Sequence, residues 1–388
     1  MFSQKVLDIE QETIDFRRRL HADAELSFKE FHTTELLISE LGKCPELELS
    51  RPTKTGVVAS LKGGAGEGPI IALRADIDAL PITEETDVPF ASKNPGAMHA
   101  CGHDGHAAML LSAAKLLAAE KDSLKGEVRF IFQHAEELPP GGAIEMQKAG
   151  VTKDVDEIYG LHLQSGIPTG VFGSRPGALT SATDRFDIRV IGKGGHSAFP
   201  ETCVDPMVIA GEIISSLQTI VSRSIAAVEP AVVSICMISA GTAYNIIPGE
   251  VAITGSTRTF SRETRAKLPG IMERIVKGMC DAHGAEYEFK FSEGYASVIN
   301  DPKLTKFASG VIKDTFGEDH YREIDPLMPG EDFSAFLLDC PGFFADLGTF
   351  NGDPKYGVPH HNKLYCMDES ALKYGVQFFY DLVKARLA

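Results

Sequence analysis

The sequence predicts an α/β protein of two domains: a larger domain with a mixed sheet flanked by helices, and a smaller α+β domain of ferredoxin-like topology inserted into it. The first observation is length, because 388 residues exceed the ~250–300 that one hydrophobic core usually supports. The second is an alternation of helical and short apolar β-type segments, which is typical of a helix-covered sheet. The third is a change to alternating polar and apolar residues near Ser181. We therefore expect the larger domain at residues 1–180 and 294–388, and the insert at residues 181–293.

The larger domain is predicted to begin with two helices and a hairpin. Apolar residues at helical spacing over residues 5–42 indicate helices on either side of a turn at residues 21–27. Two β-rich runs, residues 56–62 and 69–74, flank a glycine-rich turn, which favours a hairpin. The segments that follow are predicted as a helix and two strands, at residues 104–120, 126–133 and 157–163.

The inserted segment has its own order of elements. Residues 185–191 alternate polar and apolar side chains with a period of two, as in a strand with one wet face. The segments after it are predicted as helix, strand, strand, helix and strand, at residues 206–221, 231–238, 251–259, 262–283 and 285–291. This β-α-β-β-α-β order is that of the ferredoxin-like split arrangement.

Composition argues against nucleic acid and membranes as partners. The 54 acidic and 38 basic residues give a net charge of −16, whose field repels polyanions and anionic lipid. The longest apolar stretch, residues 107–119, is interrupted by Ser112 and Lys115 and falls short of the ~20 residues that cross a bilayer. The first twenty residues carry acidic and arginine side chains in place of the apolar run of a secretory signal, so we expect a cytoplasmic protein.

The cysteines indicate reduced thiols. There are seven, an odd number, widely scattered and without a C-x-x-C pair, which argues against a disulfide framework or a zinc finger. Each one is by default a small buried hydrophobe. Cys101 is singled out only by its neighbours.

The densest chemical signal is residues 98–106, where three histidines and a cysteine gather at the start of a predicted helix. Thiolate and imidazole are ligands that suit zinc and other late divalent ions. Flanking glycines allow the backbone to direct these side chains towards one point. The alternative is a helix entry with incidental polar residues.

Three further segments offer polar groups of the same kind. An apolar strand stops at Glu136 and Glu137, and adjacent residues on an extended chain point in opposite directions, so one can bind metal while the other faces a water. His162 lies within an apolar strand, and His361 follows His360 in a loop after a glycine- and proline-bearing stretch. Each of these features alone has a common structural explanation. A Glu-Glu pair is usually solvated at the surface, a histidine within an apolar strand is often a hydrogen-bonded core residue, and the His360–His361 pair could belong to an ordinary surface loop.

Together these segments resemble, in the same chain order, the aminoacylase and hippurate-hydrolase branch of the metal-dependent amidohydrolase and carboxypeptidase superfamily, which includes the plant auxin-conjugate hydrolases. The resemblance spans nearly the whole chain. Its motifs lie at residues 74–81, 99–106, 134–137, 160–162, 192–200, 245–248 and 329–333.

The resemblance implies a role for each matched residue. Cys101 would bridge two divalent metal ions, and His103, Glu137, His162 and His361 would complete their ligand sets. Glu136 would be the general base, and Asp78 would fix the tautomer of a metal-binding histidine. The remaining roles concern the substrate: His196 would polarise the scissile carbonyl, with Asn245 nearby, and Arg258 would engage the substrate carboxylate.

The implied reaction is hydrolysis of the amide bond of an N-acyl amino acid, a small-molecule substrate. The metal, whether zinc, manganese, nickel or cobalt, stays open, as does the acyl group. The resemblance also implies a homodimer or higher homo-oligomer formed through the inserted domain, with His196 supplied in some relatives by the partner. One departure from the family pattern is Lys363, where relatives commonly have a proline two residues after the ligand His361.

Two other functions remain open on the sequence alone. A dipeptidase or carboxypeptidase would use the same machinery on peptides, because only the pocket selects the substrate. A binding protein that has lost catalysis would keep the fold and a structural metal, but it would be expected to lack the base or a ligand. Glu136 and all five ligand positions are present.

Overall fold

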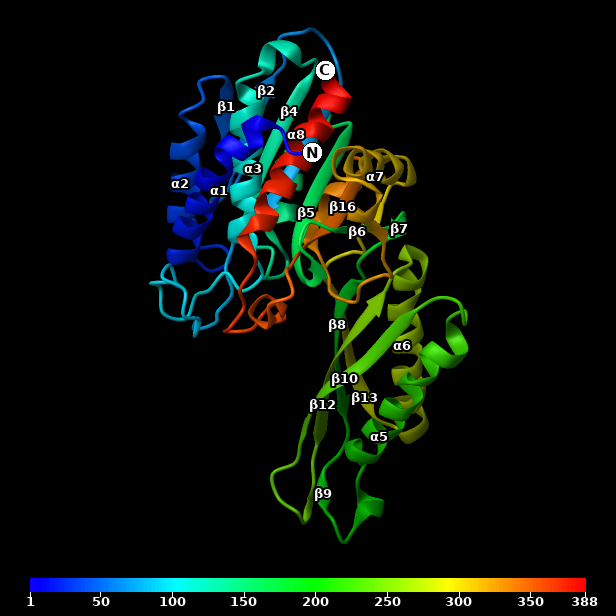
Figure 1. Ribbon diagram of the computed structural model, residues 1–388. Coiled ribbons are helices and arrows are strands. Elements are labelled where there is room, and N and C mark those ends of the chain that lie inside the picture. The colour runs from blue at the N-terminus through cyan, green and yellow to red at the C-terminus, as the bar shows by residue number, and fades with distance from the viewer. The chain divides into compact units, whose positions relative to one another are not determined.

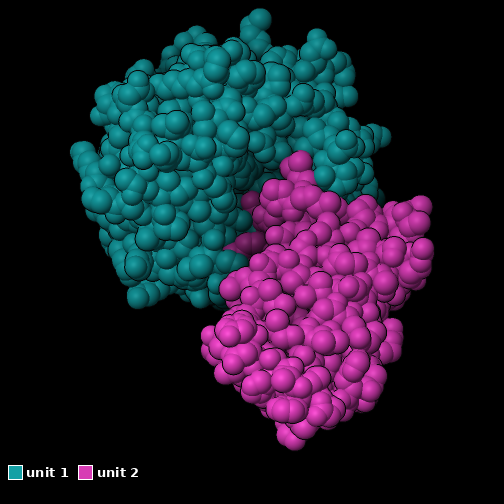
Figure 2. Space-filling view, turned by 90° about the horizontal axis from the view of Figure 1, so that it is seen from below, with its two compact units in different colours: residues 1–179, 298–326, 332–388 teal, residues 180–297, 327–331 magenta.

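The computed structural model describes residues 1–388, which form two compact units (Figures 1 and 2). Unit 1 comprises Met1–Leu179, Val298–Pro326 and Asp332–Ala388. Unit 2 comprises Thr180–Ser297 and Leu327–Glu331. The predicted insert at residues 181–293 falls within unit 2, which also takes in the short segment Leu327–Glu331. None of the helices combines the length and the apolar character needed to cross a bilayer.

Unit 1 is a mixed sheet with helices on both faces. Its helices are α1 (Gln4–Ala22), α2 (Phe31–Leu41), α3 (His103–Ala118), α4 (Gly142–Lys148), α7 (Pro302–Phe316) and α8 (Leu372–Leu387). Its strands are β1 (Leu47–Ser50), β2 (Val57–Lys62), β3 (Ile70–Asp76), β4 (Glu127–Gln133), β5 (Glu157–Pro168), β6 (Phe172–Ser174), β7 (Gly177–Ala178), β14 (Ile299–Asn300), β15 (Tyr321–Glu323) and β16 (Gly342–Phe350). The main sheet has the order β1-β2-β4-β3-β5-β16-β6-β15.

The predicted hairpin of residues 56–62 and 69–74 is wrong. β2 and β3 are not neighbours, because β4 lies between them, antiparallel to β2 and parallel to β3. The glycine-rich turn instead runs against the segment that enters β4, with Gly63 N–H donating to Gly126 O at 2.9 Å. A Cβ on Gly63 would lie 2.1 Å from Leu124 O, so glycine at this position permits the close approach.

The strand side chains alternate between two cores on the two faces of the sheet. On β3, Ile71 and Leu73 join the core formed with α1, α3, α7 and α8, whereas Ala72 joins the core formed with α4 and the segment Asp332–Leu338. β4 divides its residues in the same way. Figure 1 shows α1, α3 and α8 side by side over one face. Burial on both faces explains why these strands read as continuous apolar runs.

Unit 2 is an antiparallel sheet with two helices. Its strands are β8 (Ala182–Ile191), β9 (Gly195–His196), β10 (Ala231–Ala240), β11 (Ile246–Ile247), β12 (Glu250–Thr259) and β13 (Glu286–Glu293), and its helices are α5 (Pro206–Leu217) and α6 (Arg262–His283). The four-stranded order β10-β12-β8-β13 is the ferredoxin-like arrangement expected from the sequence. α6 is capped at its N-terminus by Ser261, whose hydroxyl accepts the Thr264 N–H, and at its C-terminus by Gly284 with φ 70°.

A buried arginine joins three segments of unit 1. The Arg74 guanidinium, 1% exposed, lies 2.7 Å from Asp76 Oδ2 and 2.8 Å from Asp332 Oδ1, and its Nε–H donates to Gln133 Oε1. Asp332 also accepts hydrogen bonds from the Gln133 amide and from Ala143 N–H. These contacts tie the ends of β3 and β4 to the start of α4 and to Asp332.

Replacing Arg74 by Met is expected to lower the free energy of unfolding by about 3–5 kcal/mol, because two buried carboxylates lose their counter-charge. Urea-induced unfolding followed by circular dichroism measures the change. Arg51→Met is the matched control, since Arg51 pairs with Glu35 on the surface and its loss should leave the transition unmoved. Equal midpoints for Arg74→Met and the wild type would contradict the role of this network.

Candidate metal centre

The sheet topology brings several candidate residues to the same end of the parallel strands β3, β4 and β5. β3, β4 and β5 are parallel to one another, so the segments that follow β3 and β4 leave the sheet at the same end. Asp78 follows β3, Glu136 and Glu137 follow β4, and His162 lies on β5. α3 begins at His103, directly after Gly102, whose φ of 92° turns the chain into the helix.

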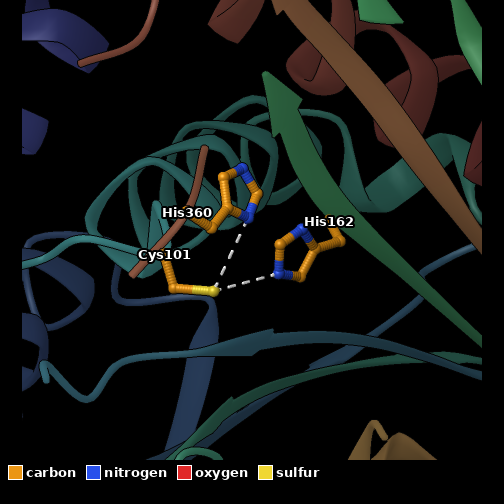
Figure 3. Close-up of side chains that lie close together, drawn as sticks. All are labelled: Cys101, His162 and His360. Atoms are coloured by element: carbon orange, nitrogen blue, oxygen red, sulfur yellow. Dashed lines mark hydrogen bonds between the residues drawn. The ribbon is translucent and has the colours of Figure 1, made fainter. Parts of the chain in front are cut away.

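The Cys101 thiol lies at the centre of the cluster. Its Sγ is 3.4 Å from His162 Nε2 and 3.8 Å from His360 Nδ1 (Figure 3). Cys101 also forms a group with His103 and Glu137, whose candidate ligand atoms all lie within 4.8 Å of one another. One sulfur is thus shared by two sets of potential ligands, as a bridging ligand requires.

Glu137 contacts His361, the residue that follows His360 in the loop before α8, and so links it to the cluster. Its Oε1 is 3.8 Å from His103 Nε2 and 3.2 Å from His361 Nε2. The His361 side chain is 54% exposed, whereas His103 is buried. All five residues predicted as ligands therefore lie in this cluster, on side chains that come from β5, the start of α3 and three loops.

Asp78 orients both His103 and the Glu136–Glu137 segment. The His103 Nδ1–H donates to Asp78, with 2.9 Å to the backbone oxygen and 3.1 Å to Oδ1, so Nε2 is the nitrogen that faces Glu137. Asp78 Oδ2 accepts hydrogen bonds from Glu137 N–H at 3.0 Å and from the Ser27 hydroxyl at 2.6 Å. The contacts to His103 are those of a carboxylate that fixes the tautomer of a metal-binding imidazole.

Two residues of the cluster region adopt backbone conformations that cost energy. Ala135 has φ 51° and His361 has φ 60°, a region that L-residues with a Cβ rarely occupy. Buried Glu30 accepts the Ala135 N–H at 2.9 Å, and Ala100 O accepts the His361 N–H at 2.9 Å. Such strain persists only where surrounding contacts enforce it, and it is common at functional sites.

Burial and carboxylates set the protonation of the cluster when no cation is bound. Burial raises the pKa of the Cys101 thiol well above its usual value, and Glu137, Glu136 and Asp76 add to the effect. Burial acts to lower the pKa of His103, but Asp76, Asp78 and Glu137 outweigh it and raise the pKa to about 10. Burial lowers the pKa of His162 well below its usual value and that of His360 to about 3, so both rings are neutral at pH 7.

The cluster fits divalent metal. His103 Nε2 is buried and makes no hydrogen bond, and buried Glu137 Oε1, besides its approach to His103, has an ion-pair contact to His361 Nε2 at 3.2 Å. Such atoms are costly unless something polar or charged satisfies them. Two ligands at the ~2.0–2.3 Å metal distances of imidazole, carboxylate and thiolate lie about 3.3–3.8 Å apart around a tetrahedral ion, close to the spacings of Cys101, His162, Glu137 and His361. Excess negative charge and soft ligand atoms both favour a late divalent cation.

The remaining predicted residues belong to unit 2. β9 pairs with β11, so His196 lies opposite Ile246 and next to Asn245, whose backbone oxygen accepts the Ser197 N–H. Both residues are exposed. Arg258 is half-buried on β12, opposite Thr183 of β8, and its guanidinium donates to Thr257 O at 2.9 Å. The structure thus brings His196 and Asn245 together and places Arg258 on the four-stranded sheet.

Sequence reasoning missed three participants. His360 precedes the predicted ligand His361, and it contacts Cys101. Asp76 and His106 lie within the matched motifs at residues 74–81 and 99–106, for which no role of either residue is predicted, yet Asp76 Oδ1 accepts the His106 Nδ1–H at 2.5 Å and His106 Nε2 accepts the Leu163 N–H at 2.8 Å. An aspartate at the end of a doubly buried strand was the available signal for Asp76, because a buried carboxylate needs partners.

Comparison with known proteins gives the family. The profile described as peptidase family M20/M25/M40 matches residues 72–385. The chain is 52% identical over 293 residues to an N-acyl-L-amino acid amidohydrolase of Geobacillus stearothermophilus, covering 76% of this chain and 79% of that protein. It is 42% identical to thermostable carboxypeptidase 2 of Saccharolobus solfataricus, covering 95% and 94%.

A solved structure adds the metal count of a relative. The YxeP protein of Bacillus subtilis, described as a dinuclear metal-binding peptidase of the M20 family, superposes with a TM-score of 0.86 at 39% identity, covering 98% of this chain and 99% of that one. Profile, sequence and fold agree over nearly the whole length. This chain therefore belongs to peptidase family M20/M25/M40.

Proposed function

We propose that this protein hydrolyses the amide bond of N-acyl amino acids, releasing a carboxylate and a free amino acid. The observation that carries the proposal is the convergence of a buried thiol, imidazoles and the Glu137 carboxylate around Cys101, with a second buried carboxylate, Glu136, at the adjacent position in the sequence. The name of the 52% identical relative, an N-acyl-L-amino acid amidohydrolase, supports this class of substrate.

The ligands of the proposed centre would be Cys101 as the bridge, with His103, Glu137, His162 and His361. The centre would hold two divalent ions, as the description of the relative from Bacillus subtilis supports. Zinc, manganese, nickel and cobalt all suit a mixed set of thiolate, imidazole and carboxylate. When bound, such ions acidify water and polarise a carbonyl oxygen.

The chain's own residues supply the proton transfers and the substrate contacts. Glu136 is buried next to Glu137 and would take a proton from the attacking water, then give it to the leaving amine. His196 would donate a hydrogen bond to the scissile carbonyl oxygen, where negative charge develops. Asn245 lies beside His196 on unit 2, and Arg258 would pair with the carboxylate of the substrate.

The assembly and the compartment belong to the same proposal. We place the enzyme in the cytoplasm, where Cys101 stays reduced, in keeping with seven free cysteines. We propose a homodimer through unit 2, because β10 is an edge strand that exposes Met237 (66%) and Ile238 (55%). Exposed apolar edge strands are prone to pair with another chain.

A second candidate is a carboxypeptidase, favoured by the 42% identical relative of that name. The cleaved bond is an amide in both cases, and the same base and metal ligands would serve. The difference lies in what occupies the acyl side: an N-acyl cap such as acetyl or benzoyl, or an amino acid with a free amino group.

Purified protein is expected to release free amino acid from N-acetyl or N-benzoyl amino acids faster than from unblocked dipeptides. Amine release is measured on both panels before chelation, after chelation and after adding back zinc, manganese, nickel or cobalt. Activity should disappear with the chelator and return with at least one metal. Cleavage of dipeptides alone would favour the carboxypeptidase, and no turnover with any metal would contradict the enzyme assignment.

Glu136→Gln is expected to lower kcat by about 10²–10⁴-fold, because an amide of similar shape cannot accept the proton. Its metal content, measured by mass spectrometry of the metals, should equal that of the wild type. Glu145→Gln is the control: this carboxylate is half-exposed, pairs with His134 and should be dispensable for turnover. Near-normal kcat in Glu136→Gln would remove Glu136 as the base.

Metal binding is expected to release protons and to tighten as pH rises. Without a cation, Cys101 and His103 both carry a proton at pH 7, because the pKa of each is raised. A ligand atom must lose its proton to bind metal, so affinity falls as pH falls, by about tenfold per pH unit for each proton released. Isothermal titration calorimetry of zinc binding in buffers of different ionisation enthalpy counts those protons. A heat that is independent of the buffer would show that the sites are already deprotonated.

A further inference from the structure

Two histidines approach the Cys101 sulfur from different parts of the chain. His162 comes from β5 and His360 from the loop before α8, and in Figure 3 both rings turn a nitrogen towards Sγ. The two rings are stacked, with centroids 5.2 Å apart and planes inclined by 28°. By proximity alone, either imidazole qualifies as a metal ligand.

The hydrogen bonds on the far side of each ring assign them different roles. The carbonyl oxygen of Leu163 lies 2.7 Å from His162 Nδ1, so the ring donates there and its lone pair is on Nε2, the nitrogen facing Cys101. The Ser165 N–H donates to His360 Nε2 at 3.4 Å, so that nitrogen holds the lone pair. A neutral His360 then carries its proton on Nδ1, the nitrogen that faces the sulfur.

We propose that His360 is not a metal ligand but a positioning residue that donates an N–H···S hydrogen bond to the Cys101 thiolate. The inference rests on the proposed metal centre, in which Cys101 is deprotonated. A donor at this place withdraws electron density from the sulfur, which weakens its donation to the bound ions and keeps them stronger electrophiles. It also holds the thiolate in its bridging position.

Neighbouring contacts fix His360 for this role. The Tyr365 ring packs edge-on against it, with centroids 4.9 Å apart and planes at 84°. His361, the next residue, is directed to Glu137 at 3.2 Å through its unusual backbone conformation. The left-handed backbone conformation of His361 therefore directs the proposed ligand His361 to Glu137, while the preceding residue, His360, faces the Cys101 sulfur as a hydrogen-bond donor.

Cobalt spectroscopy of the full-length protein tests the assignment. The holoenzyme is prepared with Co(II), and its cobalt content and its sulfur-to-cobalt charge-transfer absorption are measured for the wild type, His360→Leu, His360→Asn and His162→Ala. His360→Leu removes the donor. His360→Asn keeps an N–H near the position of Nδ1. His162→Ala is the reference for loss of a true ligand.

His360→Leu is expected to keep the full cobalt content while its charge-transfer band moves to lower energy, because the thiolate becomes a stronger electron donor. His360→Asn should restore the band towards that of the wild type. His162→Ala should lose cobalt. Cobalt affinity in His360→Leu should weaken by about 10–100-fold, the usual effect of removing a group that supports a ligand.

Three outcomes would overturn the inference, and they are distinguishable. Loss of cobalt in both His360 variants, to the level of His162→Ala, would make His360 a ligand. If the charge-transfer band of His360→Leu stays at the wild-type energy, the proposed N–H···S hydrogen bond is wrong. If the wild-type protein binds cobalt but shows no sulfur-to-cobalt charge-transfer band, Cys101 is not a ligand and the proposed centre is wrong.

Discussion

The candidate metal centre is built on a buried charge network whose cation is Arg74. Removing a guanidinium and two carboxylates from water costs several kcal/mol per ion, so the group is stable only when every member is paired. Arg74 contacts Asp76 and Asp332, and Asp76 in turn accepts a hydrogen bond from His106. His106 then accepts the Leu163 N–H. One chain of contacts thus links the Asp332 segment and β3 to α3 and β5, which carry the candidate ligands His103 and His162.

This network explains why the cluster can hold an excess of carboxylates. Asp76 is compensated by Arg74 and His106, and Asp78 is satisfied by Ser27, His103 and Glu137 N–H. Glu137 keeps one buried oxygen without a hydrogen bond. The positive φ of Ala135, supported by buried Glu30, directs the chain into the Glu136–Glu137 pair. A divalent cation would supply the charge that this arrangement lacks, at side chains whose positions are already fixed by these contacts.

The parts of this structure that sequence can predict are those that depend on local pattern. The helix at α3 and the β-α-β-β-α-β order follow from periodicity, and Cys101 and His103 stand out because they lie in one dense motif. Strand pairing is not local, so β2 and β3 looked like a hairpin although β4 separates them. The partnership of Arg74 with Asp332 and that of Cys101 with His360 each join residues about 260 positions apart. The local sequence around one residue of such a pair carries no information about which distant residue it contacts.

Hydrogen bonds at the ring nitrogens, more than ring positions, distinguish the potential metal ligands among the histidines of this cluster. A neutral imidazole has one lone pair, so a ring whose far nitrogen donates leaves its near nitrogen available. His162 donates to Leu163 O and therefore presents a lone pair to the cluster, and His103, which donates to Asp78, would present one once a cation replaces its second proton. His106 is engaged at both nitrogens, by Asp76 and by Leu163 N–H. The backbone of Leu163 thus distinguishes two of these rings. Its carbonyl oxygen accepts the His162 Nδ1–H, which leaves the Nε2 lone pair of His162 available, and its N–H occupies the Nε2 lone pair of His106.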